Sequence, residues 1–193
     1  MHQSLPHGEK VFDDRRSAGK ELAEALITQA DNFHAILGLT RGGVPVAFEV
    51  ASAMHIPLDA IVIKKLRAPN NPELAIGAVS SNGGKVLRNS IIRQLGVSEK
   101  YLAAETEGRT AEAKADEKNY RGNHQPLDIN GCSVAIVDDG IATGSSIEAA
   151  VLSARQKGAN RITVATPVAS QEACSALRSV ADDVFCLTTP ADF

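Results

Sequence analysis

The sequence has no tryptophan, and Phe, Tyr and Trp together make up only 4% of its 193 residues. A site that holds a flat ligand by ring stacking therefore has few side chains to draw on. The cysteines are also few, and Cys132, Cys174 and Cys186 are an odd number without CxxC spacing. This pattern favours reduced thiols in a cytoplasmic protein over a disulfide framework or a zinc site.

Long apolar runs and an excess of one charge are absent as well. No stretch approaches the ~20 apolar residues that a membrane-spanning helix needs, and the polar stretch 1–10 lacks the apolar region of a signal peptide. With 20 Lys and Arg against 23 Asp and Glu, the net charge of −3 does not favour nucleic-acid binding, which depends on phosphate neutralisation. We expect neither a membrane nor a nucleic acid as a partner.

Short apolar runs alternate with helical patterns along the chain, without an internal repeat or a linker. Because strands that are apolar throughout occur in parallel sheets covered on both faces, this order predicts one α/β domain over 1–193. A hairpin of 75–80 and 85–87, together with the termini, is expected to form a small cap. The predicted strands are 35–39, 58–64, 133–137, 161–165 and 184–187, and the predicted helices are 15–29, 44–54, 98–120, 145–157 and 171–179.

The strongest functional signal follows the predicted strand 133–137. Two carboxylates, Asp138 and Asp139, end this strand, and a loop of small residues at 140–144 then opens a helix. Backbone amides of such a loop, backed by a helix N-terminus, suit a phosphate group, whereas the carboxylates are assigned to sugar hydroxyls or to hydrated Mg²⁺. A phosphate beside a diol describes a ribose 5-phosphate. Further donors for the anion are the hydroxyls of Thr143, Ser145 and Ser146.

Other phosphate-binding patterns do not fit this loop. Gly140 and Gly144 enclose three residues and no Lys follows, so the loop is not a Walker A motif, and the GxGxxG fingerprint of dinucleotide-binding proteins is absent. These absences count against a dehydrogenase or a kinase. The alternative to any phosphate site here is a purely structural one, in which an acidic strand end is followed by a capped helix.

The stretch 134–146 resembles the phosphoribosyl pyrophosphate signature of type I phosphoribosyltransferases, and the resemblance covers most of the chain. It is strongest to uncharacterised bacterial members of the family that carry F-x-D-R near the start and a D-D-G-I-A-T-G loop late. The resemblance implies a three-layer α/β fold with a parallel sheet, a core at about 31–170 and a small hood from the N-terminal segment and 183–193. The matching segments are 12–15, 39–43, 71–78, 120–122 and 138–144.

The resemblance also implies a reaction. It is the transfer of ribose 5-phosphate from phosphoribosyl pyrophosphate to a nitrogenous base or similar acceptor, with release of pyrophosphate, by a Mg²⁺-dependent homodimer. The roles implied for catalysis fall on Arg41 and on Asp138 and Asp139, which hold the ribose hydroxyls and, through water, Mg²⁺. The residues implied to bind the donor around its 5′-phosphate are Gly140, Ile141, Ala142, Thr143, Gly144, Ser145 and Ser146.

Thr40, Arg41, Gly42 and Gly43 follow the first core strand and match the family's pyrophosphate loop. Their chemistry fits independently, because Arg41 can clamp phosphate oxygens in a fork and the two glycines let the backbone approach closely. The family often has a non-proline cis peptide here, which makes the Thr40–Arg41 bond the candidate. An ordinary strand-to-helix turn is the alternative.

Lys64, Lys65 and Arg67 are implied to counter the charge of the leaving pyrophosphate. Neighbouring strand residues face opposite sides, so only one of the two lysines is expected to enter the site. The segment 67–84 takes the place of the family's mobile loop, which closes over the substrate. A loop at 67–72 followed by a plain hairpin is the alternative.

Three further polar features are interpreted as structural. The charged residues 13–16 suit the N-terminus of a helix, where acids are favoured. Arg121 is interpreted as a surface charge, with a phosphate contact across a dimer as the alternative. The predicted helix 98–120, capped by Ser98, is interpreted as a solvated arm because its pattern is rich in charge.

The acceptor is less well specified than the donor. Hypoxanthine–guanine enzymes of the family carry an acid/base Asp where this chain has Ala142, which cannot move a proton. Glu73 or Asp192 is a candidate for that carboxylate, or the acceptor needs none. Similar proteins commonly continue beyond the point where this chain ends, so the hood is expected to be incomplete, and a non-catalytic regulatory protein that binds phosphoribosyl pyrophosphate stays open. The segments implied to recognise the acceptor are 166–170 and 187–193.

The few aromatic residues divide by their position in the sequence. Phe33 and Phe48 are expected to lie against core elements. Phe185 and Phe193 fall in the predicted hood, where an aromatic ring can stack on a base.

Overall fold

A five-stranded parallel sheet lies at the centre of the computed structural model, which describes residues 12–29 and 33–190. The strand order is β2-β1-β6-β7-β8, and each neighbouring pair is parallel. This confirms the predicted parallel sheet. The strands are β1 (Ala35–Leu39), β2 (Leu58–Ile61), β6 (Ser133–Val137), β7 (Arg161–Val168) and β8 (Asp183–Thr188).

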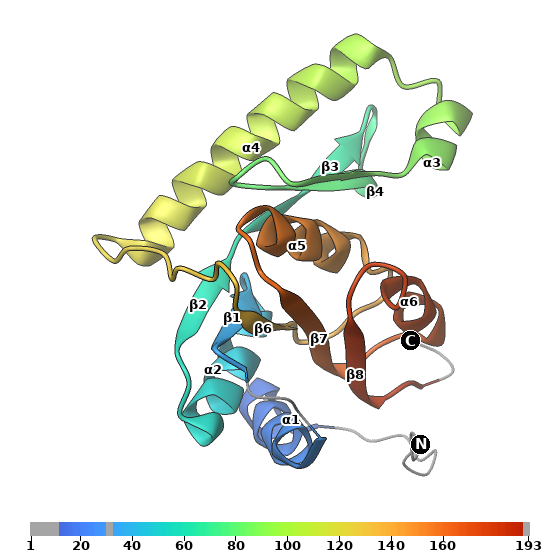
Figure 1. Ribbon diagram of the computed structural model, residues 1–193. Helices are drawn as coiled ribbons and strands as arrows, with labels where there is room; N and C mark the ends of the chain where they lie inside the picture. The colour runs from blue at the N-terminus through green and yellow to red at the C-terminus, as the bar shows by residue number, and fades with distance from the viewer. Residues whose placement is uncertain (1–11, 30–32, 191–193) are drawn as a thin grey trace.

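Helices cover both faces of this sheet, which explains why its strands are apolar throughout. On one face α1 (Arg15–Gln29) and α2 (Gly43–Met54) pack over alternate residues of β1 and β6. On the other face α5 (Ser145–Gln156) and α6 (Gln171–Leu177) pack over the intervening residues (Figure 1). The helices α1 and α2 lie very close together, because a Cβ at Gly19 would come within 2.9 Å of the Val46 carbonyl oxygen.

A second sheet was not expected from the sequence. The predicted strand 58–64 divides at Val62, and its second part begins an antiparallel sheet of order β3-β4-β5. Within β3 the exposed Lys65 and Arg67 alternate with the buried Leu66, which is the pattern of a strand covered on one side only. The strands are β3 (Ile63–Ala68), β4 (Asn71–Ser80) and β5 (Lys85–Leu87).

The predicted hairpin of 75–80 and 85–87 is confirmed, because β4 and β5 pair antiparallel. The loop predicted at 67–72 is wrong, since its ends belong to β3 and β4, which form a second hairpin. Asn70, with a φ of 64°, turns the chain between β3 and β4. Two short contacts hold this hairpin to the long helix α4 (Glu99–Arg121): the Arg67 amide donates to Glu105 Oε1 at 3.0 Å, and the Tyr101 hydroxyl donates to the Arg67 carbonyl at 3.1 Å.

The helix α4 lies along the second sheet, after the short helix α3 (Asn89–Gln94) (Figure 1). Ser98 caps it as expected, accepting a hydrogen bond from the Tyr101 amide at 3.2 Å. Tyr101 and Leu102 pack on the small core of the second sheet, whereas most of the helix is solvated and Ala113 is its buried residue. The predicted arm is thus solvated on one side and packed on the other.

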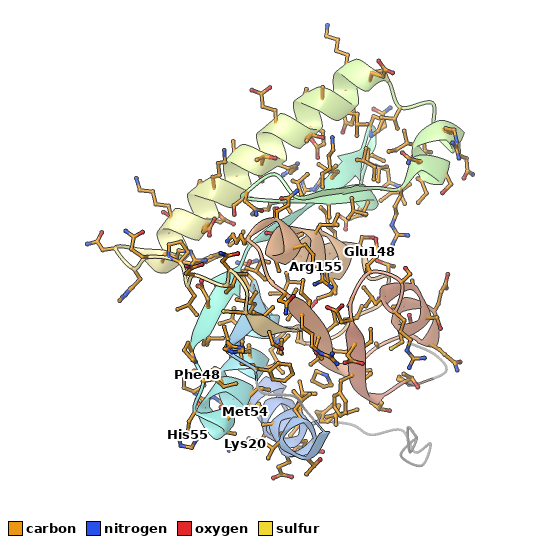
Figure 2. The ribbon with its side chains drawn as sticks, in the orientation of Figure 1. Lys20, Phe48, Met54, His55, Glu148 and Arg155 are labelled. Atoms are coloured by element: carbon orange, nitrogen blue, oxygen red, sulfur yellow. The ribbon has the colours of Figure 1, made fainter. Side chains whose placement is uncertain are left out.

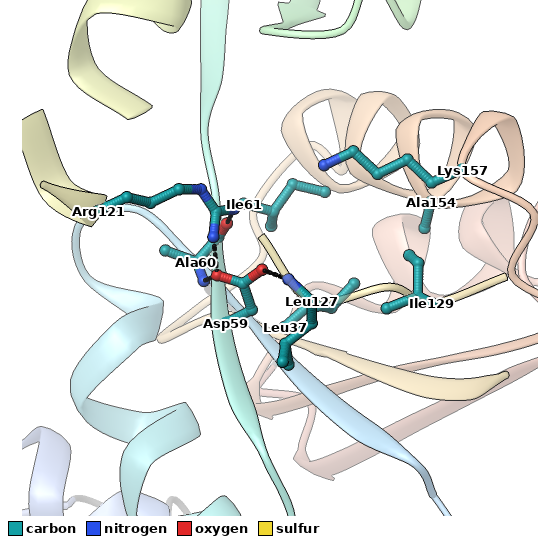
Figure 3. Close-up of a pocket in the computed structure, with 9 residues that line it drawn as sticks. All are labelled: Leu37, Asp59, Ala60, Ile61, Arg121, Leu127, Ile129, Ala154 and Lys157. Carbon is teal, nitrogen blue, oxygen red and sulfur yellow. Dashed lines mark hydrogen bonds and ion pairs between the residues drawn. The ribbon is translucent and has the colours of Figure 1, made fainter. Parts of the chain in front are cut away.

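The end of α4 is fastened to β2 by a buried ion pair. The Arg121 guanidinium donates to Asp59 Oδ1 and to the Ala60 carbonyl, and Asp59 Oδ2 accepts from the Leu127 amide, beside a small pocket (Figure 3). The side chains of Arg121 and Asp59 are only 10% and 12% exposed. The interpretation of Arg121 as a surface charge is wrong, because local pattern does not reveal that α4 returns to β2.

Residues 183–188 of the predicted hood form β8 at the edge of the main sheet. Phe185 is partly buried and packs against the cluster beneath α1 and α2. Phe33 is buried as expected, but Phe48 on α2 is 51% exposed (Figure 2), so its assignment to the core is wrong. The N-terminal segment 1–11 and residues 191–193 lie outside the described residues. Over the described ranges, no helix combines the length and apolarity needed to cross a membrane.

Replacing Arg121 by Ala is expected to lower the free energy of unfolding by about 3–5 kcal/mol, because Asp59 would keep a buried charge without its partner. Arg16→Ala is the control, since the Arg16 side chain is 75% exposed and its Nε lies 3.8 Å from Glu49 Oε1; such a long contact of a solvated arginine typically contributes about 0–1 kcal/mol. Urea unfolding followed by circular dichroism measures both, and equal losses would contradict the role given to the buried pair.

Candidate active site

The candidate site lies where β1 and β6 end side by side. The chain leaves β1 toward β2 on one side and returns to β6 on the other, so the strand order reverses between them. Ligands of open α/β sheets bind at such a point, beyond the carboxyl ends of the strands. A pocket of about 450 Å³ opens there, a size suited to a small molecule. Its lining residues are Arg15, Leu39, Thr40, Arg41, Gly42, Lys65 and the run 138–147.

The turn after β1 packs directly against the two carboxylates after β6. A Cβ at Gly42 would overlap the Asp139 carboxylate, and a Cβ at Gly43 would lie 2.8 Å from the Asp138 Cα. Gly43 therefore allows α2 to approach β6 and does not line the pocket, whereas Gly42 does. The Thr40–Arg41 peptide bond is cis, as the resemblance implies.

Asp138 and Asp139 differ in their surroundings. Burial raises the pKa of Asp138 to about 7, and the neighbouring Asp139 charge acts in the same direction. Two features oppose the shift, because the Asp139 amide donates to Asp138 Oδ1 at 2.9 Å and Lys65 lies nearby as a positive charge. Asp139 instead has a cation as its partner, since Arg15 Nε donates to Asp139 Oδ2 at 2.8 Å.

Arg15 lines the pocket, although the charge pattern of 13–16 predicts only the N-terminus of a helix. The prediction of a helix N-terminus is right for Asp14, whose Oδ1 accepts from the Ser17 amide at 2.7 Å and so caps α1. Arg15 itself points to the pocket. The only signal for it in the sequence was its place in the F-x-D-R segment.

Of the two adjacent lysines, one faces the pocket, as the alternation of a strand requires. Lys65 lines the pocket, while Lys64 Nζ lies 2.6 Å from Asp116 Oδ2 on α4. Arg67 lies on the same exposed side of β3 as Lys65 but is not among the lining residues, and the pairing of β3 with β4 shifts register on both sides of it. The structure therefore does not bring Lys64 or Arg67 to the site.

The loop 140–144 is supported from two directions. On the side of the main sheet, the Ile141 amide donates to the Val168 carbonyl at 3.0 Å, and Ser170 Oγ donates to the Ala142 carbonyl at 2.8 Å. The Ile141 amide is thus already used, and the amides available to an anion begin later in the loop. Gly144 has a φ of 75°, a conformation that glycine adopts without strain.

On the other side the loop is held by Arg88, which the sequence analysis did not identify. Arg88 follows β5, and its Nη2 donates to the Thr143 carbonyl at 2.8 Å while its Nε donates to Ser145 Oγ at 2.7 Å. An arginine can only donate, so the Ser145 hydroxyl is the acceptor in this contact and its own proton is not used there. No local pattern marks an arginine that reaches the loop from another sheet.

The donor set of the pocket suits a hydrated divalent ion better than a protein-only metal site. Asp138 and Asp139 supply carboxylate oxygens, which Mg²⁺ prefers. Within the described part of the chain, no group of three or more His, Cys, Asp or Glu side chains gathers to hold a metal. Magnesium commonly keeps several waters and shares the oxygens of a bound phosphate compound. The two carboxylates beside a phosphate-type loop fit that mode.

Comparison with known proteins agrees with this geometry. Residues 13–193 match the family model described as phosphoribosyl transferase domain. The chain is 39% identical over 184 residues to curated relatives from two Mycobacterium tuberculosis strains, which are named provisionally as phosphoribosyl transferases. That alignment covers 95% of this chain but 42% of the relatives, so the chain spans less than half of their length.

Solved structures show the same fold. The crystal structure of TT1426 from Thermus thermophilus is 41% identical, with a TM-score of 0.78 over 94% of this chain and 86% of that one. Adenine phosphoribosyl transferase from Trypanosoma brucei, solved with AMP, pyrophosphate and ribose-5-phosphate, is 14% identical with a TM-score of 0.51 over 92% of this chain and 66% of that one. At that identity the likeness concerns the fold alone.

Asp138→Asn is expected to stabilise the ligand-free protein at pH 8. The carboxyl ionises near pH 3.8 when unfolded and near 7 when folded, so the folded state holds more protons between these values and stability falls as pH rises through them. Asparagine removes that loss, which a shift of this size places at about 4 kcal/mol. Thermal and urea unfolding with EDTA at pH 4 to 8 measure it, and an unchanged pH dependence would contradict the role of burial.

Proposed function

The chain belongs to the phosphoribosyl transferase domain family, and on that premise we propose that it transfers ribose 5-phosphate from phosphoribosyl pyrophosphate to a nitrogenous acceptor. One observation carries the proposal. A single pocket combines an anion loop at the start of α5, two carboxylates after β6, and the cations Arg41 and Lys65. These groups match the phosphate, the ribose hydroxyls and the pyrophosphate of that donor.

The 5′-phosphate is assigned to the loop and the first turn of α5. Its donors are the backbone amides after Ile141 and the hydroxyls of Thr143, Ser145 and Ser146. The positive end of the α5 dipole favours the same anion. Asp138 and Asp139 follow β6 next to this loop, where their oxygens accept hydrogen bonds from the ribose hydroxyls.

The pyrophosphate is assigned to the turn after β1. Gly42 brings the backbone close, Arg41 supplies a planar fork of donors, and Lys65 adds a second positive charge. Bound Mg²⁺ would be held by Asp138 and Asp139 through water, and it supplies charge neutralisation on the pyrophosphate oxygens.

In the proposed reaction, the bond between the ribose and pyrophosphate breaks through a cation-like ribose, and an acceptor nitrogen attacks with inversion. The protein acts mainly by position and charge. The loop anchors the phosphate, the carboxylates orient the ribose, and Arg41 and Lys65 stabilise the charge that develops on the leaving group. Covalent chemistry by a side chain is not required.

The acceptor subsite has no carboxylate at position 142. Glu73 is exposed at the start of β4 and is not a lining residue, and Asp192 lies outside the described residues. The proposal therefore favours an acceptor that needs no protein base at this position. For the same reason the second candidate function is a regulatory protein that binds phosphoribosyl pyrophosphate without turnover. Pyrophosphate release that depends on an added base would exclude it.

The proposal extends to a cytoplasmic homodimer. The three cysteines are free, which is typical of a reducing compartment. The homodimer rests on the family resemblance alone.

Calorimetry with phosphoribosyl pyrophosphate and Mg²⁺ tests the donor site. We expect Asp139→Asn and Thr143→Ala each to weaken binding about tenfold or more, because a hydrogen bond to a charged group contributes about 1.5–3 kcal/mol. Asp128→Asn and Thr28→Ala are matched controls outside the pocket and should bind like the parent. Absence of binding by the parent at millimolar donor would overturn the proposal. If the parent binds the donor, a screen of bases for pyrophosphate release identifies the acceptor.

Arg88→Gln is expected to weaken binding of ribose 5-phosphate about tenfold, because the loop loses the charged donor that holds the Thr143 carbonyl and orients Ser145 Oγ. Arg93→Gln, an exposed arginine on α3, is the control. Affinities are compared at one ionic strength, since salt screens such effects. Equal affinities for the parent and Arg88→Gln would show that the loop holds its shape without Arg88.

A further inference from the structure

We propose that Arg15 is a pyrophosphate-binding residue, and that its guanidinium moves from Asp139 to the pyrophosphate when the donor binds. The inference rests on the proposed function, because it assigns a role to a residue of the same pocket. Neither the loop after β1 nor the loop after β6 includes Arg15, which comes from the start of α1.

The position of Arg15 is set by the packing of α1. Asp14 caps the helix, and Gly19 lets the next turn lie against α2, with its Cα facing the Val46 carbonyl. The start of α1 is thereby held at the rim of the pocket. The first helical residue is then directed at the carboxylates after β6, and its Nε reaches Asp139 Oδ2 at 2.8 Å.

The contact also places the guanidinium beside the turn that is assigned to pyrophosphate. The Asp139 carboxylate lies directly against Gly42, so a group bonded to Asp139 is a neighbour of that turn. An arginine side chain spans several rotatable bonds, and its five donors fit phosphate oxygens in a fork. A change of rotamer is therefore enough to carry it from one carboxylate to an adjacent phosphate.

The pair with Asp139 is of a kind that breaks easily. The Arg15 side chain is 60% exposed, and exposed ion pairs contribute little to stability. When the ribose hydroxyls approach, they compete for the same Asp139 oxygens. The donor also brings more negative charge than Arg41 and Lys65 alone neutralise. Both effects favour transfer of the guanidinium to the pyrophosphate, where the hydrogen bonds are charge-assisted and bidentate.

The adjacent Arg16 provides a natural comparison. It has the same side chain and the same helix terminus, but its Nε faces Glu49 on α2 at 3.8 Å, and it does not line the pocket. General electrostatic attraction by the start of α1 would affect both arginines alike. A direct contact with pyrophosphate involves Arg15 alone.

Calorimetry in the presence of Mg²⁺ measures the binding of three ligands separately: pyrophosphate, ribose 5-phosphate and phosphoribosyl pyrophosphate. The proteins compared are the parent, Arg15→Gln, Arg15→Lys and Arg16→Gln. We expect Arg15→Gln to weaken pyrophosphate and phosphoribosyl pyrophosphate binding about tenfold or more, because charged hydrogen bonds are lost. Binding of ribose 5-phosphate should stay unchanged or become tighter, since Asp139 no longer has a competing partner. Arg15→Lys should restore part of the loss, and Arg16→Gln should behave like the parent.

Two results would overturn the inference while leaving the proposed function intact. One is an equal loss for ribose 5-phosphate and pyrophosphate in Arg15→Gln, which would mean that Arg15 only orients Asp139. The other is unchanged pyrophosphate binding in that variant. If the parent binds none of the three ligands, the proposed function itself fails. Thermal unfolding of each variant separates loss of contact from loss of fold, and the charge-conserving Arg15→Lys variant keeps the comparison valid if Arg15→Gln is unstable.

Discussion

The contact between the turn after β1 and the carboxylates after β6 is the constraint on which the site depends. Gly42 and Gly43 leave no room for a side chain, so two loops that belong to different strands meet backbone to carboxylate. The Arg41 cation on one loop and the carboxylates on the other are then neighbours in one pocket. Asp138 lies against Gly43 in this contact, and burial is the main cause of the rise of its pKa to about 7. The contact of the two loops thus bears on both the shape of the pocket and the raised pKa of Asp138.

The anion loop after β6 is held in place by contacts from elsewhere in the fold. Two parts of the fold hold it: the link between β7 and α6 through Ser170, and the second sheet through Arg88. Both contacts use loop carbonyls, so the amides of the following residues stay directed at the pocket. Preorganised donors bind an anion without the cost of ordering the loop at the moment of binding. The second sheet is thus part of the site's support, although Lys65 is its one residue among those that line the pocket.

The main sheet and the anion loop could be predicted from the sequence because their signals are local. Apolar runs of strand length mark a buried parallel sheet, and two acids before a run of small residues mark a loop at its edge. What the sequence did not reveal depends on contacts between distant segments. Contacts between residues far apart in the chain bury Arg121 against Asp59 and bring Arg88 to Ser145. The strand predicted over 58–64 divides at Val62 because its second part pairs in another sheet. Adjacent residues could not be distinguished either, since Arg15 and Arg16 differ only in where the start of α1 points.

The buried pair of Asp59 and Arg121 also has a topological consequence. The chain leaves the main sheet after Ile61 and comes back to the same strand at Arg121, which contacts Asp59 and Ala60 (Figure 3). Everything between these points, β3 to β5 with α3 and α4, is an excursion whose two ends lie together. Such a segment can lengthen, shorten or be exchanged during evolution without changing the order or spacing of the parallel strands. The fold thereby separates the parallel sheet from an excursion in which Lys65 and Arg88 are constrained by the site, while the rest of its length can vary.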